Sequence, residues 1–314
     1  MSSLYADARA AARTAAASQA YPQGTLYVVA TPIGNLADIS LRALHVLALV
    51  DSIACEDTRH TQQLLKAYGI DKTSAQLLAV HQHNEAEAAI AVIDRLRQGQ
   101  RVAYVSDAGT PAISDPGARL VAAVRAQAIR VVPLPGASSV TTAMSAAGVM
   151  SHTAGEGELT TGFVFAGFLP SKSQERMHAV QAIAAEPRCV VLMEAPHRIE
   201  ALATAVGALG DRPVTVAREL TKQFEEIATV PASDLTTWLA QQPNRLRGEF
   251  VLVVHPAKVA QQVGEEARVL KLLLAELPLK TAVKLAVEIT GVGRNVLYEQ
   301  ALAIKGSKTL QPQH

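Results

Sequence analysis

The sequence has few cysteines, few aromatic residues and almost no net charge, and each shortage narrows what the protein can be. Only Cys55 and Cys189 occur in 314 residues, which excludes a disulfide framework and a cysteine-based zinc site and favours a reducing compartment. Aromatic residues make up 4%, which suits parallel strands covered by helices better than an antiparallel sandwich. The net charge of +1 excludes a protein that coats nucleic acid non-specifically, so any nucleic-acid contact must come from a local patch.

Long hydrophobic runs and the common nucleotide fingerprints are also missing. No uncharged apolar run approaches the roughly 20 residues that span a bilayer. The Ala-rich residues 1–22 lack the basic start and apolar stretch of a secretory signal. We therefore expect a cytoplasmic protein in which residues 1–22 form a flexible tail or a loose helix. The absence of G-x-G-x-x-G, G-x-x-x-x-G-K-[ST] and G-x-S-x-G disfavours dinucleotide-binding, P-loop and serine-hydrolase functions.

The residues that are present alternate between two kinds of element. Hydrophobic residues make up 49% and charged residues 18%, enough for a large core. Over residues 23–134, strand-like runs such as 25–30 and 101–106 alternate with helical patterns such as 85–98. This alternation predicts an N-terminal α/β domain with a parallel sheet and right-handed crossovers.

Two further parts follow this domain. Proline and glycine at 133, 135 and 136 predict a hinge. A second α/β domain is predicted over residues 135–257, where strand and helix patterns again alternate. From residue 265 three short helical patterns are separated by Pro278 and by two glycines, which predicts a small all-helical module at 265–308.

The segment SDAGTPAISDPG, Ser106 to Gly117, is the first candidate for a ligand site. It directly follows a predicted parallel strand, and ligands of open α/β sheets bind beyond the carboxyl ends of such strands. Gly109 and Gly117 allow close approach of a ligand, while Asp107 and Asp115 offer acceptors near a cationic group. A tight, well-capped loop explains the same residues equally well.

Three other motifs in this domain also follow predicted strands. TPIGN at 31–35 is typical of a simple turn, and EDTR at 56–59 forms either a site or a solvated ion-paired rim. PLPGASS at 133–139 offers backbone N–H groups to an anion or merely caps a helix. Each motif alone is a weak signal.

The second domain carries three charged clusters, EAPHR at 194–198, RELTKQFEE at 218–226 and RGEF at 247–250. All lie at predicted strand ends, which should converge in space. Their basic residues could meet phosphates, which favours a nucleic-acid substrate over an apolar one. His197 alone is more typical of a structural histidine.

Together these motifs resemble the tetrapyrrole-methylase-like superfamily of S-adenosylmethionine enzymes. Within it they are similar to the 2′-O-ribose methyltransferases that modify a cytidine of small-subunit (16S) ribosomal RNA at the decoding centre. The matching segments, from Thr25 to about Val254, are LYVVATPIGNLADIS, EDTRHTQQLL, SDAGTPAISDPG, PLPGASS, FVFAGFLP, EAPHRI, RELTKQFEE and RGEFVLVV. Eight motifs in register make the resemblance specific.

The resemblance implies two α/β/α domains that hold S-adenosyl-L-methionine in the cleft between them, a helix-turn-helix-like module, and a homodimer without a metal. The residues that it places against the donor are Ile33, Thr110, Ile113, Ser138, Ser139, Phe165 and Met193. The substrate it implies is small-subunit ribosomal RNA, naked or in an assembled subunit.

Basic residues are the predicted contacts to this RNA. They are Arg59, Arg198, Arg218, Lys280, Lys284 and Arg294. Residues 265–314 contain seven Lys or Arg and five Glu, a net +2, so a structural or dimer role for the helical module competes with RNA binding.

The implied reaction is an in-line displacement at the methyl carbon, without a covalent enzyme intermediate. Positioning the two reactants is worth ~7–11 kcal/mol, and a base adds ~10²–10⁴-fold. Glu219 and Lys222 are our catalytic candidates because their strand end should face the cleft, with Asp57 and Glu56 less favoured. Two other functions stay open, methylation of a tetrapyrrole or corrin and a non-catalytic RNA-binding role in ribosome assembly.

Overall fold

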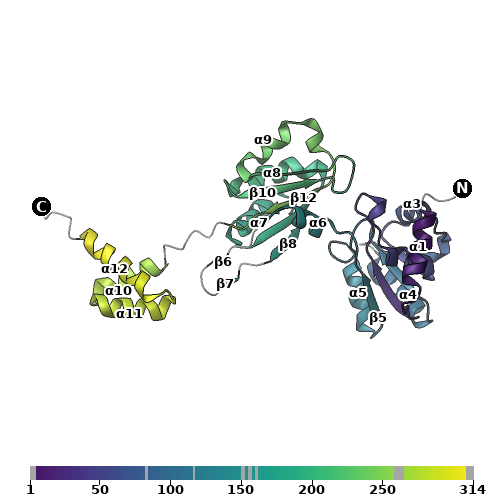
Figure 1. Ribbon diagram of the computed structural model, residues 1–314, viewed down its shortest axis with the longest axis horizontal. Helices are drawn as coiled ribbons and strands as arrows, with labels where there is room; N and C mark the ends of the chain where they lie inside the picture. Colours follow the sequence, from purple (N-terminus) through teal and green to yellow (C-terminus); the bar gives the residue numbers. More distant parts are fainter. Residues whose placement is uncertain are drawn as a thin grey trace. The chain divides into compact units, whose positions relative to one another are not determined.

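The computed structural model describes residues 5–81, 84–115, 117–149, 153–154, 158–159, 162–257 and 265–308. These residues fall into two compact units, which we describe separately. The first contains two α/β halves and ends at Ala257, and the second contains the C-terminal helices together with Ala154 (Figure 1). The predicted architecture of α/β halves and a helical module is confirmed. Every helix in the described ranges is too short or too polar to serve as a membrane span.

The first half is built on a parallel sheet with the strand order β3-β2-β4-β1-β5. Its strands are β1 (Thr25–Val29), β2 (Ser52–Cys55), β3 (Leu77–Ala79), β4 (Val102–Val105) and β5 (Arg130–Leu134). β1, β2 and β4 are buried along their whole length, as expected for strands covered on both faces. Because all strands are parallel, the motifs that follow them meet at one edge of the sheet.

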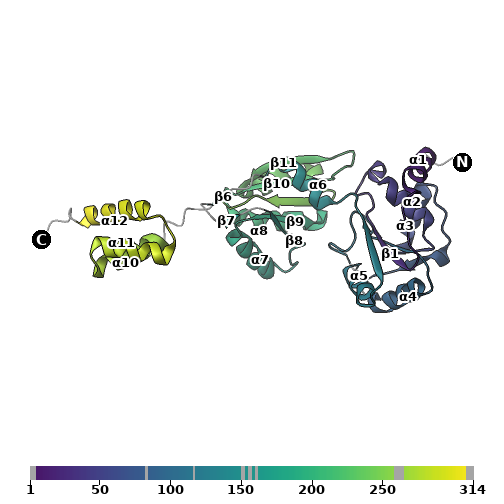
Figure 2. The same cartoon turned by 60° about the horizontal axis from the view of Figure 1, so that its bottom comes forward.

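Helices cover both faces of this sheet, above and below β1 in Figure 2. α2 (Leu41–Leu49) and α3 (Thr58–Ala67) pack on one face, and α4 (Glu85–Arg97) and α5 (Gly117–Ala126) on the other. α2 begins where the Ser40 hydroxyl accepts a backbone N–H at 3.1 Å, a typical N-cap.

Part of the expected tail at residues 1–22 is a packed helix. α1 (Ala6–Ala16) lies against α2, with Ala12 and Ala16 each 1% exposed. The ring of Tyr5 meets that of Tyr68 edge-on, with centroids 5.1 Å apart. Alanine favours helix, and its small side chain lets two helices approach closely, so the composition that suggested a loose segment instead supports a docked one.

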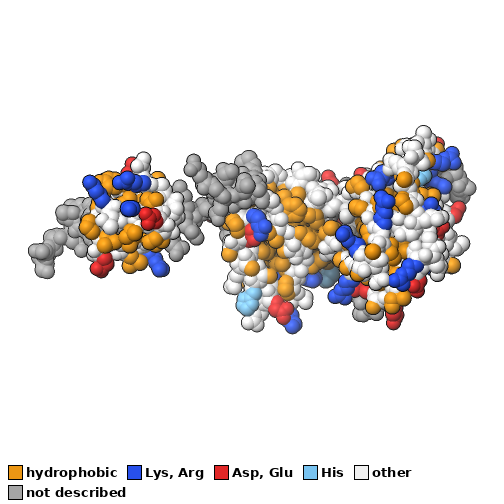
Figure 3. Space-filling model, turned by 90° about the horizontal axis from the view of Figure 1, so that it is seen from below, with side chains coloured by type: hydrophobic (Ala, Val, Ile, Leu, Met, Phe, Trp, Pro, Cys, Tyr) orange, Lys and Arg blue, Asp and Glu red, His pale blue; other side chains and the backbone are white. Residues whose placement is uncertain are grey.

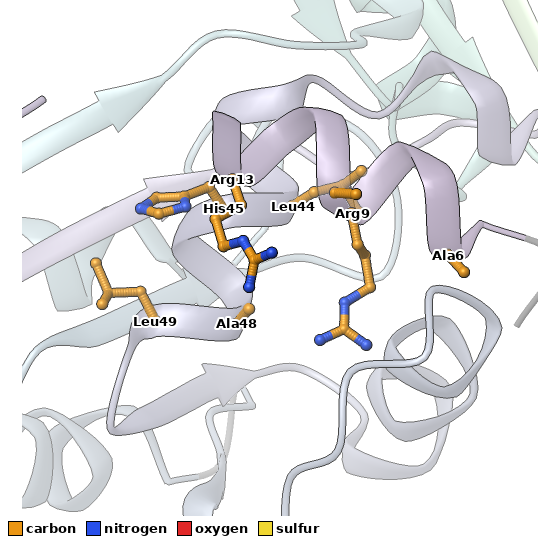
Figure 4. Close-up of a pocket in the computed structure, with 8 residues that line it drawn as sticks. Ala6, Arg9, Arg13, Leu44, His45, Ala48 and Leu49 are labelled. Atoms are coloured by element: carbon orange, nitrogen blue, oxygen red, sulfur yellow. The ribbon is translucent and has the colours of Figure 1, made fainter. Parts of the chain in front are cut away.

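A groove of about 410 Å³ lies between α1 and α2. Figure 4 shows Arg9 and Arg13 of α1 together with Leu44 and His45 of α2 along it. The guanidinium of Arg9 donates to the carbonyl of Gly69, and burial lowers the pKa of His45. None of the residues that line this groove is among the predicted site residues.

The second half is built on a mixed sheet with the order β11-β10-β12-β9-β8. Its strands are β8 (Phe163–Gly167), β9 (Cys189–Glu194), β10 (Pro213–Arg218), β11 (Glu226–Pro231) and β12 (Phe250–Val254). β8 and β9 are parallel, whereas β12 runs antiparallel to β9 and β10, and β11 antiparallel to β10. Two short strands, β6 (Thr153–Ala154) and β7 (Glu158–Leu159), form a separate pair.

Helices also cover both faces of the mixed sheet. α6 (Ser139–Ala146) packs on one face against β9 and β12. α7 (Ser173–Ala185), α8 (Ile199–Val206) and α9 (Leu235–Ala240) pack on the other, where they form the larger apolar core. Since α6 begins at Ser139, shortly after the end of β5, its N-terminus lies beside the edge where the first half ends.

Arg212 ties several segments of this half together. Its guanidinium donates to four backbone carbonyls at 2.6–3.3 Å, those of Ile183, Glu186, Arg188 and His255. Burial lowers the pKa of Arg212. These charge-assisted bonds connect the end of α7, the start of β9 and the end of β12.

The second unit consists of α10 (Glu265–Glu276), α11 (Leu279–Thr290) and α12 (Arg294–Lys308). Its core contains Leu270, Val283, Ala286, Leu297 and Ala301. Pro278 precedes α11, and Gly291 ends it with a φ of 70°, as the sequence indicated. On the face seen in Figure 3, basic, acidic and hydrophobic side chains of this unit are mixed.

Candidate functional site

Three loops of the first half meet at the carboxyl edge of its sheet. Thr31, after β1, exchanges backbone hydrogen bonds of 2.9 and 3.1 Å with Gly109 in the long loop after β4. The Thr110 hydroxyl of that loop donates to the carbonyl of Ala137, after β5, at 2.9 Å. The φ of Gly109 is 81°, a left-handed conformation that glycine adopts without strain. The motifs TPIGN, SDAGTP and PLPGASS thus form one wall.

Asp115 shapes the long loop from inside. Its carboxylate accepts the Ala112 and Gly117 N–H groups at 2.8 and 2.7 Å and the Tyr104 hydroxyl at 3.0 Å. Asp107 in turn accepts the N–H of Asp57 at 3.2 Å. Both aspartates therefore hold the loop in place with their side chains.

Glu56, directly after β2, is a carboxyl group beside this wall whose pKa is strongly raised. Burial, followed by the charges of Asp115 and Asp107, raises the pKa of Glu56 from 4.5 to about 7. One backbone N–H, that of Asp107, reaches Glu56 Oε1 at 3.3 Å and opposes the rise. Glu56 is therefore partly protonated near neutral pH.

The second half presents its own edge, where the three charged clusters converge as predicted. β9 and β10 end there and β12 begins there, since Phe250 pairs with both Glu194 and Arg218. The convergence arises because β12 is antiparallel to its neighbours, so that its first residues lie beside their last ones.

Two adjoining cavities, of about 250 and 300 Å³, lie between these two edges. They share Ala108, Ser139, Phe168, Met193 and Glu249 as lining residues. Ile33 lines the first cavity, and Thr110, Ile113 and Ser138 line the second. Six of the seven residues predicted to contact a donor thus surround one continuous region.

The seventh residue, Phe165, lines neither cavity and packs in the core beneath them with Val191 and Ala217. Phe168, which sequence reasoning missed, is 49% exposed and lines both. The register of β8 shifts between Phe165 and Gly167, and Gly167 has a φ of 64°. This bulge turns the chain so that the later phenylalanine reaches the cavities.

Lys222 lies between two carboxylates at this edge. Its ammonium nitrogen is 2.8 Å from Glu219 Oε1 and 3.0 Å from Glu249 Oε2. Burial acts to lower the pKa of Lys222, but the two carboxylates outweigh it and raise that pKa. Burial likewise acts to raise the pKa of Glu219, but bonds from Lys222 and the Glu249 N–H lower it. Lys222 is therefore a cation and Glu219 an anion.

Lys222 also touches the opposite wall. Gly34 of the TPIGN turn faces the Lys222 side chain, the Thr221 hydroxyl and the Leu220 carbonyl so closely that a Cβ would collide with them. Glu219 and Lys222 do not line the two cavities themselves, but Glu249, to which Lys222 is bonded, lines both. The cluster of Lys222, Glu219 and Glu249 therefore lies at the rim of the two cavities that the predicted donor residues line.

The predicted RNA-binding arginines differ in accessibility. Arg218 is 7% exposed and donates to the carbonyls of Phe224 and Arg247 at 3.0 and 3.2 Å, so its position does not support a phosphate contact. Arg198 is partly buried and pairs with Glu194 at 3.1 Å. Arg59 is exposed, with Asp57 at 2.8 Å.

On the helical module the three predicted contacts, Lys280, Lys284 and Arg294, are exposed. They lie at the start of α11, in its middle and at the start of α12. An exposed cation is available to a phosphate, but its position alone does not select RNA over another polyanion.

Comparison with known proteins gives matches over nearly the whole chain. The model of the Tetrapyrrole (Corrin/Porphyrin) Methylases matches residues 25–236, and that of the RsmI C-terminal HTH domain matches residues 260–305. The chain is 49% identical over 288 residues to Ribosomal RNA small subunit methyltransferase I of Escherichia coli O157:H7, covering 90% of this chain and 96% of that protein. The protein of the same name from Pseudomonas aeruginosa is 49% identical over 289 residues, covering 90% and 98%.

Solved structures agree on the fold. Cobalt precorrin-4 methyltransferase CbiF superimposes with a TM-score of 0.52 at 18% identity, over 76% of this chain and 98% of that one. Diphthine synthase gives a TM-score of 0.53 at 14% identity, over 74% and 90%. At such low identity these likenesses concern the α/β halves alone and not what they act on.

Proposed function

Since the chain belongs to the tetrapyrrole (corrin/porphyrin) methylase family, we propose that it is an S-adenosyl-L-methionine-dependent 2′-O-ribose methyltransferase of small-subunit ribosomal RNA. The protein is a methyltransferase by family, and the proposal concerns its donor, its acceptor atom and the cytidine at the decoding centre. The observation that carries it is the 49% identity, over 90% of the chain, to proteins named ribosomal RNA small subunit methyltransferase I.

The cavities fit the chemistry of this donor, which combines a cationic sulfonium with an adenosine and an amino acid. Ile33, Phe168 and Met193 supply apolar surface for a purine ring. Glu56 and Glu249 supply carboxylates near the same space, which favours a cation. Ligand sites are usually apolar clefts with a few placed polar groups, and this region has that composition.

The donor, when bound, supplies a methyl group that is already activated as an electrophile. The chain then has to position the ribose hydroxyl and to stabilise the negative charge that develops on its oxygen. A protonated Lys222 fits the second task, because a fixed ammonium lowers the free energy of a developing alkoxide. Glu219 and Glu249 hold that ammonium, and either carboxylate can accept the proton that leaves the hydroxyl.

Glu56 is the competing proton acceptor. It lines the second cavity, and its pKa of about 7 suits a base near neutral pH. A pH profile separates the two assignments. Glu56→Gln should leave the rise of kcat with pH in place if Glu219 or Glu249 accepts the proton, and should abolish both rate and pH dependence if Glu56 does.

Transfer of labelled methyl from S-adenosyl-L-methionine tests the function as a whole. We expect label in assembled small subunits or in naked ribosomal RNA, and none in a tetrapyrrole. Alkali resistance of the labelled linkage places the methyl on the 2′-oxygen, whereas a labelled base with a cleavable linkage would contradict the ribose assignment. Labelled tetrapyrrole would establish that alternative function instead. No transfer at all, without donor binding in calorimetry, would establish a non-catalytic binder.

Lys222→Met and Glu219→Gln test the catalytic pair. Each should lower kcat by ~10²-fold or more while calorimetry shows unchanged donor binding, since the pair acts on the acceptor. Full methylation rates in both variants, with intact donor binding, would remove Glu219 and Lys222 from the mechanism. Glu87→Gln, which changes an exposed carboxylate on α4 away from the site, is the matched control.

Two further statements rest on the family resemblance. We propose that the protein is a cytoplasmic homodimer and that the module of α10, α11 and α12 helps to hold the RNA through Lys280, Lys284 and Arg294. Sedimentation at micromolar concentration tests the first. Subunit binding by the triple Ala variant, with donor binding as reference, tests the second.

A further inference from the structure

A third pocket, of about 690 Å³, opens beside the catalytic candidates in the second half. It is formed by the turn between β10 and β11 and by the segment that leads into β12. Its lining consists of Arg218, Glu219, Gln223, Phe224, Glu225, Glu226, Gln242, Asn244, Arg247 and Gly248. None of the predicted donor contacts is among them.

Phe224 lines this pocket and is exposed to solvent, although large hydrophobic side chains are usually buried. Its side chain is 69% exposed, and no other aromatic ring of the described residues pairs with it. The turn that carries it is well built, because Glu225 Oε2 accepts the Thr221 N–H at 2.6 Å and the Glu225 N–H donates to the Lys222 carbonyl at 3.1 Å. Glu219 and Thr221 have φ values of 51° and 65°, a conformation that non-glycine residues adopt at a cost.

The opposite wall carries amides and one arginine without a side-chain partner. Gln242, Asn244 and Arg247 are exposed, and no described carboxylate forms an ion pair with Arg247. Arg245 nearby is engaged, since it pairs with Glu226 at 2.7 Å and lies 3.9 Å above the Trp238 ring. Arg245 thus binds within the protein, whereas the exposed Arg247 is available to a ligand.

The acidic residues of the pocket are already occupied within the protein. Glu219 binds Lys222, Glu226 binds Arg245, and Glu225 accepts the N–H of Thr221. The groups that remain for a ligand are an aromatic face, several amides and one guanidinium. Stacking on an aromatic ring combined with amide hydrogen bonds is how proteins recognise unstacked bases of single-stranded RNA.

We propose that this pocket holds an unstacked nucleotide of the RNA substrate, with its base on Phe224 and a phosphate on Arg247. The inference rests on the proposed function and deepens it by locating the acceptor strand. Glu219 lines the pocket, bonds to Lys222 and through it to Glu249, which lines the donor cavities. A nucleotide in the pocket therefore lies beside the catalytic candidates Glu219 and Lys222.

Phe224→Ala tests the stacking, with Phe224→Trp as the variant that restores an aromatic face. We expect KM for the RNA substrate to rise at least ~10-fold in Phe224→Ala, with kcat at saturation and donor binding unchanged, and to return within about threefold of wild type in Phe224→Trp. An unchanged KM in Phe224→Ala, or an equal defect in both variants, overturns the proposal. Failure of the proposed function is distinguishable, because wild-type protein would then transfer no methyl to RNA at all.

Two further measurements identify the occupant. The indole of Phe224→Trp should lose fluorescence on addition of a short oligocytidylate, whereas wild type, with Trp238 only 8% exposed, should not respond. Arg247→Gln should reduce the slope of log K against log salt by about 1 for naked RNA. Weaker binding of Phe224→Ala to assembled subunits but not to naked RNA would indicate a protein partner at this pocket and would also overturn the proposal.

Discussion

Replacing Glu56 with glutamine should make the protein more stable at alkaline pH but not at acidic pH. The carboxyl group is half-buried directly after β2 and faces Asp107 and Asp115, with the Tyr104 hydroxyl nearby. Its pKa is about 7 in the folded protein against an ordinary value of 4.5. At 1.36 kcal/mol per pKa unit, this gap corresponds to about 3 kcal/mol of unfolding free energy, and because the group is only half-buried, solvent screening reduces it to about 1–2 kcal/mol.

The sign follows from which state binds the proton more tightly. A raised pKa means that the folded state prefers the protonated acid, so the contribution of Glu56 is fully present below pH 4.5 and is lost as pH rises through 7. Glutamine stays neutral throughout. The unfolding free energy of Glu56→Gln should therefore equal that of wild type near pH 4.5 and exceed it by about 1–2 kcal/mol at pH 8.

Urea unfolding followed by circular dichroism at several pH values measures this difference. Carboxyl-carbon NMR of Glu56 gives its pKa independently. Glu87→Gln, on the exposed face of α4, is the matched control and should show no pH-dependent gain. A stability difference between Glu56→Gln and wild type that is constant from pH 4.5 to 8 would refute the reasoning.

Three other predictions follow from contacts described above. Gly34→Ala should lower kcat by ~10–100-fold, because a Cβ there displaces Lys222 and a small misplacement near the reacting groups is costly; steady-state kinetics measures the rate, and thermal unfolding measures the loss of stability that the collision with the Leu220 carbonyl adds. Arg212→Met should lower the unfolding free energy by about 2–4 kcal/mol in urea titrations, since four carbonyls lose a charged donor. Ala12→Glu should detach α1, with a loss of about 1–3 kcal/mol and new tryptic cleavage at Arg13 identified by mass spectrometry, while uncut α1 would contradict its docking.

The first-half wall of the site could be predicted from the sequence because parallel strands leave no choice about where their ends meet. Once β1, β4 and β5 are recognised, the loops at Thr31, Gly109 and Ala137 must adjoin. The residues on these loops that are predicted to contact the donor line the two cavities, whereas the strand order and the long-range hydrogen bonds needed the structure.

The second half was less predictable because its strands run in both directions and its charges pair across them. Nothing local in the sequence shows that Arg218 is buried under two turns or that Lys222 is shared by Glu219 and Glu249. The bulge in β8, because of which Phe168 and not Phe165 lines the cavities, is likewise a tertiary feature. The pKa of about 7 for Glu56 depends first on its burial and then on the carboxylates of Asp115 and Asp107, more than fifty residues later in the chain, which composition does not reveal.

Arg218 joins the two turns of the third pocket through their main chains, in addition to an ion pair of 3.6 Å with Glu226. It donates to the carbonyl oxygens of Phe224 and Arg247, and these oxygens exist whatever side chains the two positions carry. Substitutions at either position therefore leave the tie intact while they alter the surface that a partner meets. The backbone frame and the side-chain surface of the third pocket can thus vary separately, so a change of that surface need not rebuild the rim of the sheet or the cavities beside it.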